Sequence, residues 1–94
     1  MVITSRYPSD PQLCFEHFSI QMASGAISES TPHEKGVIEH VVVIDGQLDL
    51  CVDGEWQTLN WGEGVRFAAD VTHFYRNGGE QTVHFHSLIH YPRS

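Results

Sequence analysis

The sequence is poor in basic residues. Its 94 residues include five lysines and arginines against twelve aspartates and glutamates, which gives a formal net charge of −7. A chain of this sign repels the phosphate backbone of DNA or RNA, because basic side chains supply most of the attraction to it. We therefore expect that this chain binds no nucleic acid by itself.

Long apolar segments and cysteine pairs are also missing. No run of eighteen apolar residues exists, and residues 1–6 lack the apolar centre and the small-residue cleavage site of a secretion signal. The two cysteines, Cys14 and Cys51, have no CxxC spacing and are interpreted as buried or half-buried thiols in a reducing compartment. These absences predict a cytoplasmic protein without membrane contact.

No ten-residue segment carries a helical apolar stripe, and the apolar residues recur instead with a period of two. The predicted strands include residues 13–22, 37–44 and 48–52, a returning strand with Trp56 and Leu59, and residues 65–69. Asp53-Gly54 is a strong hairpin signal after the strand over 48–52. A second hairpin is predicted with its tip at residues 77–79, between strands over 73–76 and 82–91.

Short antiparallel strands at spacings of about 8 to 12 residues predict an all-β sandwich or small barrel, and a small barrel can enclose one ligand. With 40% hydrophobic residues, the chain can build one small core and no second domain. Pro8 and Pro11 disfavour both a helix and a strand ladder near the N-terminus. We therefore expect an arm or linker over residues 1–12 and a single domain over residues 13–94.

Two spaced patterns carry the candidate chemistry. They are His33-x5-Glu39-x6-Gly46 and Gly62-x10-His73-x3-Asn77. Residues two apart on a strand share one face, so we expect His33, Lys35 and Glu39 to point the same way if the segment is extended. A hairpin-returning strand would bring His73 beside them. Two imidazoles and one carboxylate on one wall form a ligand set for Fe(II), Mn, Ni or Zn, so the predicted metal ligands are His33, Glu39 and His73.

The same intervals resemble the two motifs of the cupin family. The first motif, G-x5-HxH-x3,4-E-x6-G, is similar to residues 32–46, where Lys35 replaces the second histidine. The second motif, G-x5-PxG-x2-H-x3-N, is similar to residues 62–77, which keep every interval but have Ala68 and Asp70 at the proline and second glycine. The resemblance covers about residues 13–92 and implies a small antiparallel jelly-roll β-barrel.

A narrower resemblance concerns bacterial transcriptional regulators. Residues 33–43, 67–73 and 88–93 are similar to the C-terminal cupin domain of regulators that carry an N-terminal helix-turn-helix of the XRE class. The resemblance implies an effector-binding domain and not an enzyme, with DNA bound through an N-terminal domain that this chain does not contain. It also implies a homodimer that matches a two-fold operator. The expected effector is a small molecule, sulfur-containing or anionic.

Lys35 leaves several alternatives open for the site. A lysine repels a metal ion, so the three ligands hold either a divalent metal completed by water or effector, or no metal. Without metal, Lys35, His33 and His73 can clamp an anionic group, with Phe67 lining the pocket. In a third alternative, Glu39 only accepts hydrogen bonds within a polar core. The alternative functions are a metal-dependent dioxygenase or isomerase and a dimerisation scaffold without ligand.

Four of the other five histidines lie on predicted strands near the site pattern or at the end of the chain and stay outside the predicted site. His84, His86 and His90 share one face of the last predicted strand and could form a second cluster. His40 has the opposite parity to Glu39 and is expected to face away from the barrel interior. Histidines on strands are usually hydrogen-bonded to their neighbours, so none of the four is assigned to the metal.

Overall fold

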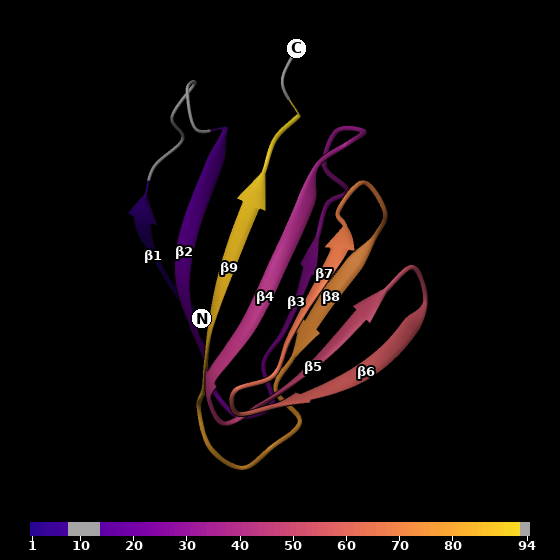
Figure 1. Cartoon of the computed structure of the whole chain (residues 1–94). Coiled ribbons are helices and arrows are strands. Elements are labelled where there is room, and N and C mark those ends of the chain that lie inside the picture. Colours follow the sequence, from indigo (N-terminus) through magenta and orange to yellow (C-terminus); the bar gives the residue numbers. More distant parts are fainter. Residues whose placement is uncertain (8–13, 93–94) are drawn as a thin grey trace.

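The computed structural model of the chain describes residues 1–7 and 14–92, and within them it consists of strands, turns and loops (Figure 1). The strands are β1 (Val2–Tyr7), β2 (Phe15–Met22), β3 (Ile27–Ser30), β4 (Ile38–Asp45), β5 (Gln47–Val52), β6 (Glu55–Asn60), β7 (Gly64–Ala68), β8 (His73–Arg76) and β9 (Val83–His90). Among the described residues, no helix is long and apolar enough to cross a membrane.

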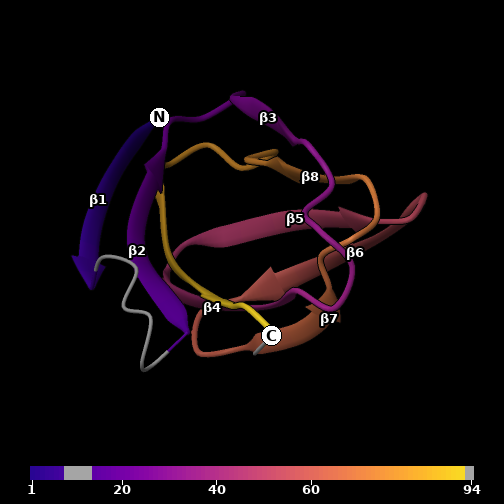
Figure 2. The same ribbon diagram turned by 90° about the horizontal axis from the view of Figure 1, so that it is seen from above.

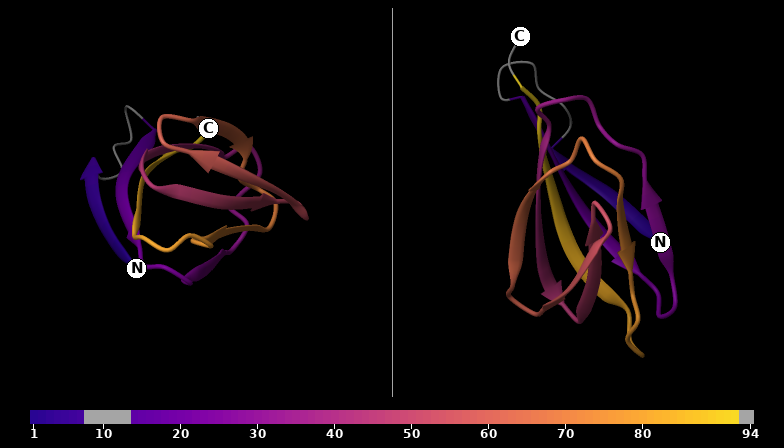
Figure 3. Two further views of the ribbon diagram at one scale, coloured as in Figure 1. Left: turned by 90° about the horizontal axis from the view of Figure 1, so that it is seen from below. Right: turned by 90° about the vertical axis from the view of Figure 1, so that its right-hand side faces the viewer.

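The strands form two antiparallel sheets. The first has the order β1-β2-β9-β4-β7, and the second has the order β3-β8-β5-β6. Seen from above and from below, the two sheets curl around a common interior (Figures 2 and 3). The prediction of an all-β, antiparallel jelly-roll barrel is confirmed.

The core follows from the period of two along the strands. In β4, Val41 and Val43 are fully buried, and in β9 the same holds for Val83 and Phe85, while the residues between them are only partly buried. Side chains of alternate parity point to opposite faces of a sheet, so each strand sends one set inward. The inward sets of both sheets, together with Met22 from β2, pack into one hydrophobic core.

The N-terminal residues belong to the sheet. Val2–Tyr7, part of the predicted arm, form β1 and pair with β2 in antiparallel register. Met1 precedes this strand, and residues 8–12 of the predicted arm lie outside the described residues. The division of the chain at residue 12 therefore stays a prediction.

One predicted hairpin is confirmed and the other is wrong. β5 and β6 are joined by the two-residue turn Asp53-Gly54, in which both residues have positive φ, as a tight hairpin with a primed turn requires. By contrast, β8 and β9 lie in different sheets, so residues 77–79 cross from one sheet to the other. The buried side chain of Asn77 fixes this crossing, because its amide donates to the carbonyls of Met22 and Gln81, at 2.9 and 2.7 Å.

Candidate functional site

The centre of the site is Glu39, a carboxylate inside the barrel. It lies on the inner face of β4, in register with Phe67 of β7 on one side and Ile89 of β9 on the other. Its exposed fraction is 1%, which places a charged group among core residues. A buried carboxylate is stable only with hydrogen-bond donors or a positive charge beside it.

His73 faces Glu39 from the second sheet. It opens β8 and is fully buried, and its Nδ1–H donates to the carbonyl of Val71 at 2.9 Å. That bond leaves Nε2 as the nitrogen that faces the barrel, 3.4 Å from Oε1 of Glu39 but without a hydrogen-bond partner among the described residues. Burial would lower the pKa of His73, but the interactions with Glu39 and the Val71 carbonyl outweigh it and raise the pKa above its usual value.

His33 completes a group of three donors. It lies in the loop before β4, where its backbone N–H donates to the carbonyl of Ala69 at 2.9 Å. Its ring lies nearly parallel to that of His73, with the centroids 6.0 Å apart. One potential ligand atom from each of His33, Glu39 and His73 lies within 4.8 Å of the other two. The sequence prediction placed these residues on one wall, whereas the structure assembles them from a loop and two facing sheets.

The second oxygen of Glu39 has partners that the sequence reasoning missed. Oε2 accepts hydrogen bonds from the hydroxyl of Tyr75 and, at 2.9 Å, from that of Ser87. Burial and then the nearby carboxylate raise the pKa of Tyr75, so its hydroxyl stays protonated and keeps donating. Tyr75 follows His73 by two residues on one strand, so a period of two was the signal that could have found it.

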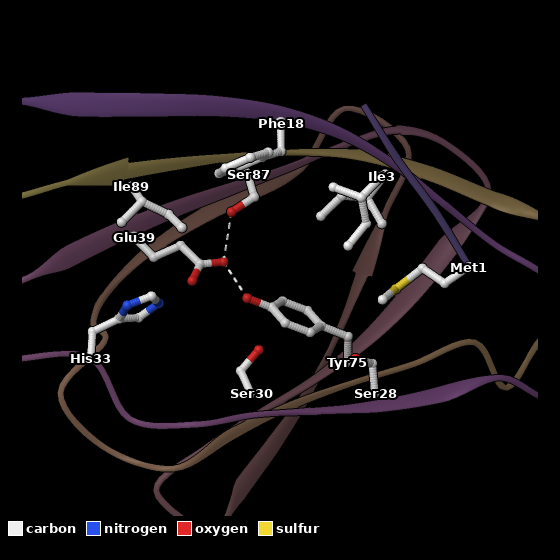
Figure 4. A pocket seen from close by; sticks show the side chains of 11 residues that line it. Met1, Ile3, Phe18, Ser28, Ser30, His33, Glu39, Tyr75, Ser87 and Ile89 are labelled. Carbon is white, nitrogen blue, oxygen red and sulfur yellow. Dashed lines mark hydrogen bonds between the residues drawn. The ribbon is translucent and has the colours of Figure 1, made fainter. Parts of the chain in front are cut away.

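A cavity of about 250 Å³ opens beside Glu39 (Figure 4). Its polar part carries the Glu39 carboxylate, one imidazole and several hydroxyl groups. Its other part is apolar and is built by the first two strands and β9. The lining residues are Met1, Ile3, Phe18, Ile20, Ser28, Ser30, His33, Glu39, Tyr75, Ser87 and Ile89.

Lys35 and Phe67, the other predicted site residues, do not line this cavity. Lys35 is exposed in a turn that the Val37 N–H closes by donating to the carbonyl of Glu34, and Gly36 has a φ of +91°. The expected extended face with His33, Lys35 and Glu39 is therefore interrupted at the glycine. Phe67 is half-buried and contacts the His73 ring edge-on, with the ring centroids 5.2 Å apart.

Comparison with known proteins gives this arrangement a family. Residues 18–89 match the profile of the Cupin_2 family, described as a cupin domain. The chain belongs to the cupin family. This cupin is 95% identical over 94 residues to the HTH-type transcriptional regulator SutR of Escherichia coli (strain K12), which covers all of the chain and 53% of that protein.

Two solved structures are also similar to this cupin. The Cupin_2 domain of an XRE family transcriptional regulator from Enterobacter cloacae shares 62% identity with a TM-score of 0.96, covering 98% of this chain and 97% of that one. An HTH_3 family transcriptional regulator from Vibrio cholerae shares 32% identity with a TM-score of 0.92, covering 97% of this chain and 51% of that one. The chain spans about half the length of the E. coli and V. cholerae regulators.

In a cupin, the group to consider at this site is a divalent metal ion. The ligand atoms of His33, Glu39 and His73 fit such an ion. With the His73 proton on Nδ1, the lone pair of Nε2 and the Oε1 of Glu39 are two buried acceptors only 3.4 Å apart. Two acceptors at that distance require a cation between them, either a proton or a metal ion. His33, Glu39 and His73 would hold the ion, which when bound supplies open coordination positions for a ligand.

Proposed function

We propose that this cupin domain is the effector-binding part of a bacterial transcriptional regulator. The observation that carries the proposal is the cavity of about 250 Å³ with the buried Glu39 carboxylate at its polar part. The names of the similar proteins support the regulatory role, since they are regulators of the HTH and XRE classes. In the full-length protein, DNA binding belongs to a helix-turn-helix outside this chain, and the domain forms a homodimer to match a two-fold operator.

The lining of the cavity narrows the class of effector. Among the residues that the structure describes, no lysine or arginine lines the cavity, and a negative ligand would face the Glu39 carboxylate. The polar part instead offers acceptors, namely the carboxylate of Glu39 and the hydroxyls of Ser28 and Ser30. We therefore favour a small neutral or cationic molecule over the anionic effector expected from the sequence. A sulfur-containing compound remains suitable, because a thioether packs well against apolar side chains.

The proposed role is binding and not catalysis. The Oε2 of Glu39 already accepts two hydrogen bonds, and Oε1 faces His73, so the carboxylate is held in place by its neighbours. A general base has to reach a substrate proton, whereas this carboxylate is suited to orienting a ligand donor or a metal ion.

Thermal unfolding with a panel of small neutral and cationic compounds, including thioethers and amines, tests the proposal. A ligand at 100 times its dissociation constant adds about 2.7 kcal/mol, which for a domain of this size raises the melting temperature by roughly 10 °C or more. The Glu39→Gln variant should lose this stabilisation, because an amide can neither balance a cation nor keep both acceptors.

Lys35→Ala is the matched control, since this side chain is exposed and does not line the cavity. It should keep the full ligand-induced shift. Unchanged melting temperatures across the panel would contradict the proposal. So would a shift that survives in Glu39→Gln but disappears in Lys35→Ala, because the ligand would then bind outside the cavity.

A further inference from the structure

Five of the seven histidines lie on the outer face of the five-stranded sheet, away from the barrel interior. In β9, the half-buried His84 and His86 alternate with the buried Val83, Phe85 and Ser87. We call this set the outer histidines. They are His17, His40, His84, His86 and His90.

The outer histidines form two separate groups. In the first group, Nε2 of His17 lies 3.0 Å from Nδ1 of His86, within hydrogen-bond distance, and the ring centroids of His84 and His86 are 5.4 Å apart. In the second group, the rings of His40 and His90 meet edge-on, with their centroids 4.9 Å apart. The first group therefore offers three imidazoles, and the second offers two.

The strand register fixes the first group. Ser19 of β2 lies opposite His86 of β9, so His17 is diagonal to His86, within reach of a long side chain. His84 and His86 are two residues apart on one strand and share its face. His84 is oriented by Ser19, whose hydroxyl lies 2.7 Å from its Nε2. The backbone ladder thus holds all three imidazoles on neighbouring strands.

The spacing of the two closest nitrogens suits a metal ion. Two nitrogen ligands at about 2.0–2.1 Å from one tetrahedral zinc ion are roughly 3.3 Å apart. The 3.0 Å between His17 Nε2 and His86 Nδ1 is close to that separation. An ion can therefore replace the proton that the two rings share if the nitrogens separate by a few tenths of an ångström and both rings turn so that their lone pairs meet at the ion. His84 can join by rotation about its side-chain torsions, which exchanges its bond to Ser19 for the ion.

Protons and nearby positive charges compete only modestly with a metal ion for these three imidazoles. Burial first, and then the positive charges of His17, His84 and Arg6, lower the pKa of His86, so its imidazole is neutral at neutral pH and available to a metal. Arg6 opposes a cation at this place, but its side chain is exposed and can turn toward solvent. The net charge of −7 on the whole chain attracts cations.

We propose that His17, His84 and His86 form a binding site for a late first-row divalent metal ion on the outer face of the five-stranded sheet, separate from the barrel site. Imidazole nitrogens suit Zn²⁺, Ni²⁺ and Cu²⁺, and water completes the coordination. Three histidine ligands from two strands leave one coordination position of a tetrahedral ion open. This site requires no ligand in the barrel, so it stands independently of the effector proposal.

Calorimetric titration of the metal-free domain with Zn²⁺ at pH 7.5 tests the site. His33, Glu39 and His73 in the barrel can take an ion of their own in this titration, so the background is the His33→Ala variant, which weakens that site. In that background, about one ion per chain should bind, and adding His86→Ala or His17→Ala should weaken that binding by roughly 10- to 100-fold. Both residues are half-buried on the surface, and circular dichroism checks that the variants fold.

Two controls make the result specific. His40→Ala removes another outer histidine and should leave zinc binding unchanged. Arg6→Gln removes the opposing positive charge and should tighten binding by about two- to fivefold at low salt. Zinc binding that is unaffected by His86→Ala and His17→Ala would overturn the proposal. Equal losses in His40→Ala and His86→Ala would overturn it as well, because the ion would then lack a defined site.

Discussion

The barrel site and the outer histidines use the same side chain in opposite settings. Burial alone would lower the pKa of both His73, inside the barrel, and His86, on the outer face of the sheet. The neighbouring groups, however, shift the two pKa values in opposite directions. Inside, interactions with Glu39 override burial and raise the pKa of His73, whereas outside, other histidines and Arg6 lower that of His86 further. The parity of a residue on its strand therefore decides whether its imidazole meets a carboxylate or other cations.

Two serines sharpen this comparison. Ser87 donates to the buried Glu39 carboxylate, and Ser19 bonds to His84 on the outer side; their exposed fractions are 3% and 6%. Hydrogen bonds to charged groups contribute about 1.5–3 kcal/mol, against about 0.5–1.5 kcal/mol for neutral pairs. We expect Ser87→Ala to lower the free energy of unfolding by about 2 kcal/mol and Ser19→Ala by about 1 kcal/mol. Urea unfolding at pH 7.5 measures both.

The order of the two serine variants is the decisive result. If Ser19→Ala destabilises the domain as much as Ser87→Ala, the hydrogen bond to the Glu39 carboxylate would be no stronger than the bond between Ser19 and His84. The two environments would then not differ as described.

A smaller effect is expected from the pH dependence of the outer face. Burial, and then His90 and Arg66, lower the pKa of His40 below its usual 6.5. When the pKa of a histidine is lower in the folded state than in the unfolded state, its full contribution to the free energy of unfolding is present above pH 6.5. This contribution is lost as the pH falls through the folded-state pKa, because the unfolded chain binds the proton more tightly. His40→Gln should therefore lose less stability than the unmodified domain between pH 7.5 and 5.5. An equal loss in urea midpoint for both proteins would show that His40 has no such role.

The features that could be predicted from the sequence are those set by residues close together in the chain. The period of two placed Glu39, Val41 and Val43 on one inner face, and Asp53-Gly54 marked a tight hairpin. Motif spacing brought His33, Glu39 and His73 together, as the structure shows.

The features that sequence reasoning missed depend on contacts between distant segments. The crossing at Asn77 is fixed by bonds to Met22 and Gln81, which no local pattern reveals. The position of Lys35 follows from a turn at Gly36, where one positive φ ends the extended segment. The partner Ser87 lies on a strand 48 residues after Glu39, so only the sheet register connects the two.

Mapping of a bound ligand by NMR tests whether the effector binds inside the barrel. Backbone amide shifts are recorded while the most stabilising compound of the thermal panel is added to the domain. Binding inside the barrel predicts saturable shifts around the cavity, at Ser30, His33, Tyr75 and Ser87, and none at His17 or His84. Shifts confined to the outer histidines, with the cavity residues unchanged, would contradict it.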